Sequence, residues 1–172
     1  DEHADGVVAD FGGGSLELAR VYQNSVHDTI SLPFGAYRVQ ALGDRAKDIL
    51  LSSLESLQGR FGTLKALYAI GGSWRVLALA YMRHRNQRGD LQGYRISTPD
   101  MIEFCRHIKG MDAEAVSETY RMESHQSRLA AVSAYTLELV LTALAPDYFV
   151  VSTAGVRDGV VHEFLLSEAK NK

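Results

Sequence analysis

Short apolar runs open the chain and are separated by turn residues. Residues 7–11 (Val-Val-Ala-Asp-Phe) form an apolar run that ends in three glycines, which is typical of a buried strand followed by a sharp turn. Residues 16–22 and 26–32 alternate apolar with polar side chains, and residues 23–25 between them suit a tight turn. Pro33 lacks a backbone donor and ends the third run. The pattern therefore predicts an antiparallel meander of three strands.

The periodicity becomes helical after the meander. Residues 35–61 carry leucines and isoleucine at steps of three and four, which predicts a helix with one buried face. Residues 67–70 form another short apolar strand, and a helix is expected after it with Ser73 as its cap. Residues 93–97 are interpreted as a small linking segment. A helix starts next, with Thr98 as its cap and proline in its first turn.

The last third of the chain is mainly helical. Helices are expected to about Arg121 and again over residues 127–144, which are rich in alanine and leucine. Residues 148–152 predict a final buried strand, followed by a helix to about Leu166. The order of elements matches the ribonuclease-H-like unit on which actin-type ATPases are built. We therefore predict one α/β domain over residues 1–172, with a mixed sheet of about five strands and helices on both faces.

Composition limits the classes of function. The chain has 172 residues, 46% hydrophobic side chains and a net charge of −3, so a surface built to attract nucleic acid is not expected. The single cysteine, Cys105, excludes an internal disulfide and a site with several cysteine ligands. The histidines show no metal-ligand spacing. No apolar run predicts a membrane span and no signal peptide is visible, so a cytoplasmic protein is expected.

The glycine-rich turn after the first strand is the strongest candidate site. Gly12, Gly13 and Gly14 let backbone amides approach an anion closely, and Ser15 adds a hydroxyl donor. Asp10 and Glu17 flank this loop, and two carboxylates beside phosphate oxygens suit a magnesium ion or an activated water. The alternative is a glycine-rich hairpin with exposed acids.

Two later loops repeat the theme of small residues between a strand and a helix. Gly71, Gly72 and Ser73 precede a helix whose N-terminus would offer free amides to phosphate, although a capped helix alone explains them as well. Gly155 and Arg157 lie in the third loop, where the arginine has the reach and geometry to bind a phosphate. A surface pair of Arg157 with its neighbour Asp158 is the alternative.

Together the three loops resemble the second domain of the exopolyphosphatase and guanosine pentaphosphate phosphatase family. The family pattern of Asp, a hydrophobic residue, three glycines, Ser, Thr and Glu stands here at residues 10–17, with Leu16 in place of threonine. Residues 71–73 (Gly-Gly-Ser) look like the family's Gly-Gly-Thr, and residues 155–159 (Gly-Val-Arg-Asp-Gly) like its Gly-Leu-Arg-Glu-Gly. The resemblance runs from about Val7 to about Leu166.

The resemblance implies a phosphohydrolase that uses Mg²⁺. Glu17 matches the family's catalytic glutamate and Asp10 a residue near the metal and phosphate. Water would attack the terminal phosphorus of inorganic polyphosphate or of the guanosine polyphosphate pppGpp, and the sequence leaves the choice open. The family's first domain, with its own phosphate loop and a second essential glutamate, is not in these 172 residues. We therefore expect negligible hydrolysis by this chain alone and an exposed apolar face through which it dimerises.

Two other functions fit the same motifs. The domain would be a regulatory module if it bound a nucleotide or polyphosphate without hydrolysing it. The presence of both Asp10 and Glu17 favours the enzyme, because a sensor does not need the pair. A kinase of the same superfamily would need an acceptor site, for which we find no residues.

Overall fold

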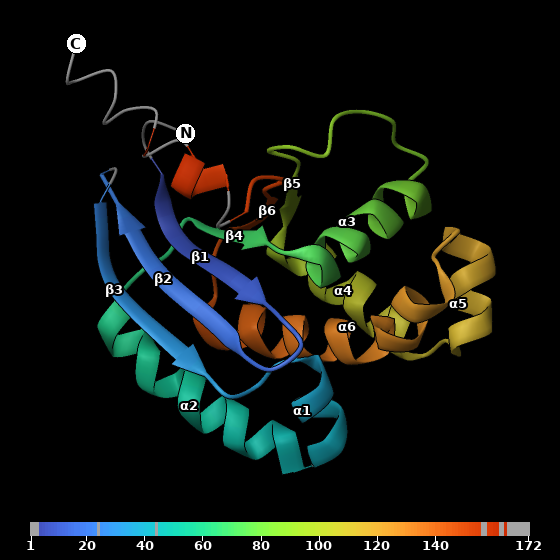
Figure 1. Cartoon of the computed structure of the whole chain (residues 1–172), viewed down its shortest axis with the longest axis horizontal. Helices are drawn as coiled ribbons and strands as arrows, with labels where there is room; N and C mark the ends of the chain where they lie inside the picture. The colour runs from blue at the N-terminus through green and yellow to red at the C-terminus, as the bar shows by residue number, and fades with distance from the viewer. Residues whose placement is uncertain (1–3, 24, 44, 156–157, 162–163, 165–172) are drawn as a thin grey trace.

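The computed structural model describes residues 4–23, 25–43, 45–155, 158–161 and 164. In that part of the chain, strands and helices follow the expected order (Figure 1). The strands are β1 (Asp5–Phe11), β2 (Leu16–Tyr22), β3 (Ser25–Leu32), β4 (Ala66–Ile70), β5 (Arg95–Ser97) and β6 (Tyr148–Val151). The helices are α1 (Ala36–Leu42), α2 (Arg45–Phe61), α3 (Gly72–His84), α4 (Thr98–Lys109), α5 (Ala113–Tyr120) and α6 (Ser124–Leu144).

All six of these strands form one mixed sheet in the order β3-β2-β1-β4-β6-β5. The first three strands pair antiparallel, which confirms the predicted meander. β1, β4 and β6 are parallel neighbours, whereas β5 pairs antiparallel with β6 at the edge. The sheet has one strand more than expected because residues 95–97, interpreted as a link, form β5. Three residues are too few for an alternating pattern to appear in the sequence.

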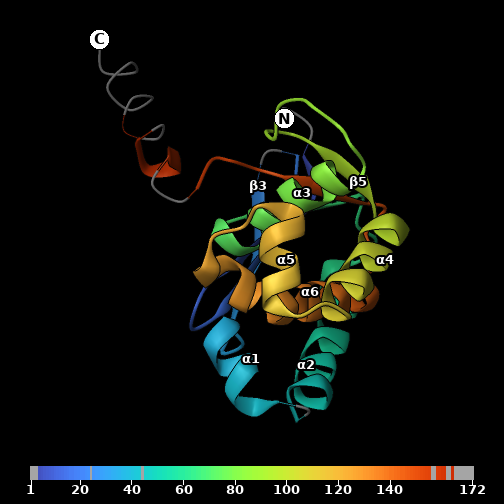
Figure 2. The ribbon, with the colours of Figure 1, turned by 90° about the vertical axis from the view of Figure 1, so that its right-hand side faces the viewer.

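Helices α1–α6 bury one face of the sheet, whereas helices on both faces were predicted. Val7, Ala9 and Phe11 of β1 point into the core and are at most 2% exposed, whereas Val8 and Asp10 between them are half-buried on the opposite face. α6 lies between α3 on one side and α1 and α2 on the other (Figure 2). The helix expected up to Leu166 falls mostly outside the described residues.

α6 is the only described helix that is long and apolar enough to cross a membrane. Within the fold, 56% of its most apolar stretch is buried inside the domain. Its apolar character is therefore accounted for by packing against the other helices in the core.

Several predicted helix boundaries are corrected by the structure. The helix expected over residues 35–61 is two helices, because the chain turns at Gly43 with a positive φ of 55°. Ser73 does not cap α3: the N-cap is Gly71, and Ser73 lies inside the first turn. The cap of α4 is Ser97 rather than Thr98, since Ser97 is extended and its side chain accepts a hydrogen bond from the Asp100 amide.

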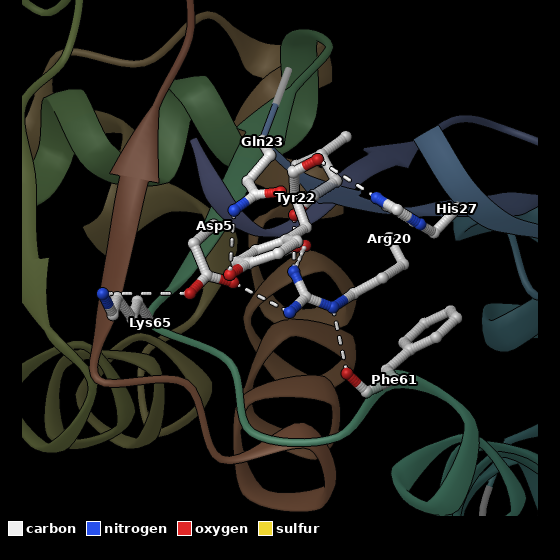
Figure 3. A network of polar contacts seen from close by, with 9 residues as sticks. Asp5, Arg20, Tyr22, Gln23, His27, Phe61 and Lys65 are labelled. Carbon is white, nitrogen blue, oxygen red and sulfur yellow. Dashed lines mark hydrogen bonds and ion pairs between the residues drawn. The ribbon is translucent and has the colours of Figure 1, made fainter. Parts of the chain in front are cut away.

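A partly buried arginine ties the start of the sheet to the end of α2 (Figure 3). Arg20 of β2 donates from Nε to the Phe61 carbonyl at 3.0 Å and from Nη1 to the Gly6 carbonyl at 2.9 Å. Its Nη2 lies 2.8 Å from Asp5 Oδ1, an oxygen with almost no access to water. Arg20 Nη1 also donates to the Val21 carbonyl, so the guanidinium serves three carbonyls and the Asp5 carboxylate at the end of the sheet opposite the glycine loops.

Replacing Arg20 by alanine is expected to lower the free energy of unfolding by about 2 kcal/mol, because three carbonyls and a carboxylate lose a charged donor. Urea denaturation of the two proteins measures the difference. Arg88→Ala is the matched control, since Arg88 is exposed. Equal losses in both variants would show that the Arg20 network adds nothing specific.

Candidate functional site

The sheet topology brings the candidate loops to one edge. The glycine loop at residues 12–15 follows β1, residues 71–73 follow β4, and residues 152–155 follow β6. Because these strands are parallel neighbours, their carboxyl ends lie at the same edge of the sheet, where α/β proteins bind ligands. The Ser152 amide donates to the Ala69 carbonyl at 2.9 Å, which fixes the third loop beside β4.

Asp10 and Glu17 lie side by side at this edge. They are directly opposed residues of the antiparallel pair β1–β2, so both carboxylates project from the sheet face that the described helices leave open. Ser31 Oγ of β3 donates to Glu17 Oε1 at 3.1 Å. The three residues line a groove of about 570 Å³ together with Val8, Ile30 and Ile70. The sequence did not predict a role for Ser31, because the alternating pattern of a strand does not show which residue of the neighbouring strand each side chain faces.

Burial raises the pKa of the Asp10 carboxyl above its usual value of 3.8, and the nearby negative charge of Glu17 raises it further. The site therefore holds a carboxylate whose charge is uncompensated. A hard cation bound between the carboxylates of Asp10 and Glu17 would compensate their negative charge and offset the repulsion between them.

Asp10→Asn is expected to stabilise the isolated chain at neutral pH. Below the unfolded pKa of 3.8 the carboxyl is protonated in both states, so the substitution has little effect there. As the pH rises through the higher folded pKa, ionisation favours the unfolded state and the wild type loses stability. Urea midpoints measured from about pH 3 to about pH 8 should show an advantage of the variant that grows with pH. An advantage that grows on acidification would contradict this account.

The second loop lies against Asp10 at the end of β1. Gly71 has a φ of +87°, and a Cβ at this position would lie 2.5 Å from Asp10 Oδ1. Only glycine combines this backbone conformation with so close an approach of the carboxylate. Gly72 and Ser73 open α3, whose N-terminus has no side-chain cap, so its first amides are available near Asp10.

Trp74 serves the core and not a ligand. Its side chain is fully buried, and its ring stacks on Phe11 with centroids 5.2 Å apart and planes at 11°. Its Nε1 donates to the Ser133 carbonyl at 3.2 Å. The indole is therefore a packing residue that joins α3 to β1 and α6.

The third loop is held by its own contacts. The Gly155 amide donates to Asp158 Oδ2 at 2.7 Å. The Thr153 amide and hydroxyl both donate to Gln92 Oε1, at 2.6 and 2.7 Å, a partner that the sequence analysis did not identify. Arg75 of α3 donates to the Thr153 carbonyl at 3.4 Å and joins the second loop to the third. Arg157 lies outside the described residues, and no described contact joins Gly155 to Asp10.

The donor set fits Mg²⁺. This ion is commonly bound by one or two carboxylates together with water and substrate phosphates, and Asp10 with Glu17 supplies such a pair. In the described part of the chain there is no group of three or more histidine, cysteine, aspartate or glutamate side chains that would form a complete protein cage for a metal.

This α/β domain, with its glycine-rich loops at the carboxyl ends of parallel strands, has the fold of the actin-like ATPases. Residues 1–168 match the sequence profile of the Ppx/GppA phosphatase family, and the chain belongs to that family. Comparison with curated protein sequences gives no match.

Solved structures of the family share the fold. An exopolyphosphatase from Cytophaga hutchinsonii superposes with a TM-score of 0.83 at 20% identity, over 96% of this chain and 58% of that protein. The Ppx/GppA family member from Aquifex aeolicus gives a TM-score of 0.77 at 20% identity, over 96% and 57% of the respective chains. The chain thus spans little more than half the length of these relatives.

Proposed function

We propose that this chain forms one wall of a phosphohydrolase site that releases the terminal phosphate of inorganic polyphosphate or of pppGpp. The observation that carries the proposal is the opposed pair Asp10 and Glu17, set beside a triple-glycine loop at the carboxyl edge of the sheet. Membership of the Ppx/GppA phosphatase family and the exopolyphosphatase among the similar structures support it.

Each part of the site has a defined task in this proposal. Glu17 is exposed to the groove and accepts a proton from the water that attacks the terminal phosphorus. Ser31 donates to Glu17 Oε1 and orients its carboxylate. Amides of the glycine loop and of the first turn of α3 bind the phosphate oxygens. Mg²⁺ held by Asp10 and Glu17 would neutralise phosphate charge in the bound substrate.

We further propose that the second wall comes from a first domain of the same parent protein. The solved relatives are longer than this chain, which covers 57–58% of them. The open sheet face carries Val8 and Ile70 in the groove beside the carboxylates, so it offers an apolar surface for such a domain to cover. In this proposal, residues 1–172 bind substrate weakly and turn it over negligibly by themselves.

Phosphate release tests the proposal. The longest reading frame that contains this chain, and residues 1–172 alone, are incubated with long-chain polyphosphate, pppGpp or ATP, in Mg²⁺ and in EDTA. Mg²⁺-dependent release by the longer protein from polyphosphate or pppGpp supports the hydrolase and identifies its substrate. Binding without release from any of the three would favour the regulatory module. Steady release by residues 1–172 alone would contradict the need for a first domain.

A further inference from the structure

The first turn of α1 is bonded to the glycine loop. The Ala36 amide donates to the Gly12 carbonyl at 2.9 Å, and the Tyr37 amide donates to the Gly13 carbonyl at 3.1 Å. α1 has no side-chain cap of its own, since its N-cap is Gly35. The carbonyls of the loop therefore take the place of a cap for this helix.

These two bonds fix the direction of the loop amides. In a trans peptide unit the carbonyl and the following N–H point to opposite sides. Because the Gly12 and Gly13 carbonyls face α1, the N–H groups of Gly13 and Gly14 face away from it. The Gly12 amide donates instead to the Ser15 carbonyl at 3.0 Å and closes the turn. The loop thus presents two neighbouring amides on the side away from the helix.

Gly35 packs directly on the back of this loop. A Cβ at Gly35 would lie 2.3 Å from the backbone nitrogens of Gly14 and Ser15 and 2.4 Å from the Gly13 carbonyl carbon. These neighbours are backbone atoms, so a side chain at Gly35 would displace the loop itself. The Tyr37 ring lies against Gly13, where a Cβ would meet it at 3.0 Å.

α1 is itself anchored in the core. Ala36 and Val39 are at most 2% exposed, and Phe34 just before the helix is 4% exposed. The helix is therefore a fixed support for the loop, and a change at Gly35 has to be absorbed by residues 12–15.

We infer that Gly35 and the first turn of α1 are positioning elements that hold the Gly13 and Gly14 amides toward the substrate phosphate. The inference rests on the proposed function and adds to it the device that orders the phosphate-binding loop. Gly35 and Ala36 do not touch the substrate, so they act through the loop.

Binding of Mg²⁺ tripolyphosphate to ¹⁵N-labelled chain tests the inference. In the wild type, the ligand is expected to shift the amide resonances of Gly13 and Gly14. Gly35→Ala is expected to move the resonances of residues 13–15 before ligand is added, and to weaken binding by on the order of tenfold, which corresponds to the loss of about one charge-assisted hydrogen bond.

Ala36→Pro is the second variant, in case Gly35→Ala fails to fold. Proline is accepted at the first position of a helix, and Gly35 already has the extended conformation (φ −76°, ψ 170°) that precedes proline. The substitution removes the donor to Gly12 and should weaken binding in the same way. Gly59→Ala is the matched control, because Gly59 lies in α2 with open space around it.

The outcomes separate the two proposals. If both variants bind tripolyphosphate as tightly as the wild type, the positioning role of Gly35 is overturned. It is also overturned if tripolyphosphate binds the wild type without shifting the Gly13 and Gly14 amide resonances. Failure of the wild-type chain to bind tripolyphosphate overturns the proposed function together with the positioning role built on it. Weaker binding in both variants, with Gly59→Ala unchanged, supports the inference.

Discussion

Replacement of Glu17 by glutamine is expected to reduce phosphate release by the full reading frame by about 10²–10⁴-fold, the usual contribution of a general base. The amide has the size of the carboxylate but cannot take a proton from water or carry charge. Ser31 still finds an oxygen to donate to in the variant, so the strand pairing and the groove should be preserved. The loss should therefore appear in kcat more than in KM.

Initial rates of phosphate release at saturating polyphosphate check this prediction. Glu55→Gln is the control, because it makes the same chemical change on an exposed position of α2. Ser31→Ala should give a much smaller loss, since it removes one oriented hydrogen bond and leaves the carboxylate. If Glu17→Gln retains the wild-type rate, the base lies elsewhere and the opposed carboxylates serve binding alone.

Trp74→Ala is expected to lower the free energy of unfolding by about 3–5 kcal/mol, the largest stability effect of the substitutions considered. The indole is fully buried, stacks on Phe11 at the end of β1, and donates to a carbonyl of α6. Its loss opens a cavity and leaves the Ser133 carbonyl without that donor. The same contacts fix α3 to the strand that carries Asp10, so the variant should also bind tripolyphosphate more weakly.

Urea denaturation followed by far-ultraviolet circular dichroism measures this effect. Trp74→Phe keeps a ring against Phe11 but lacks the indole donor, and should cost about 1–2 kcal/mol in addition to a small packing loss. Equal stability of the alanine and phenylalanine variants would show that ring packing contributes nothing. In that case the account of α3 as an anchored element would be wrong.

The sequence predicted those strands and helices that are long enough for the alternation of apolar and polar residues to be recognised. The meander and the alternation of later strands with helices were predictable, because apolar runs and glycine turns mark their ends. β5 was missed because three residues carry no period. The caps at residues 71–73 and 97–98 shifted by one or two positions, since neighbouring serine, threonine and glycine offer equivalent local chemistry.

The sequence predicted which kinds of residue form the candidate site, but not all of the contacts between them. Asp10 and Glu17 stand on either side of a tight turn, so their opposition follows from antiparallel pairing alone. Ser31, Gly35 and Gln92 reach the loops only through tertiary packing, which one sequence does not encode in any local pattern. For the same reason, the hydrogen bonds from the α1 amides to the carbonyls of the glycine loop could not be predicted from the sequence.

The approach of Gly71 to Asp10 has a consequence for transplanting this site. Residues 10–17 look like a portable unit, a hairpin with its acids and glycines in one short segment. The carboxylate of Asp10 nevertheless occupies space that a side chain at Gly71 would take, and Gly71 directly follows β4, far along the chain from the hairpin. A hairpin grafted onto another sheet would meet a side chain at that place unless the neighbouring parallel strand also ended in a glycine with positive φ. The smallest unit that could be transplanted with this site intact therefore includes both β1 and β4, together with the loop that follows each strand.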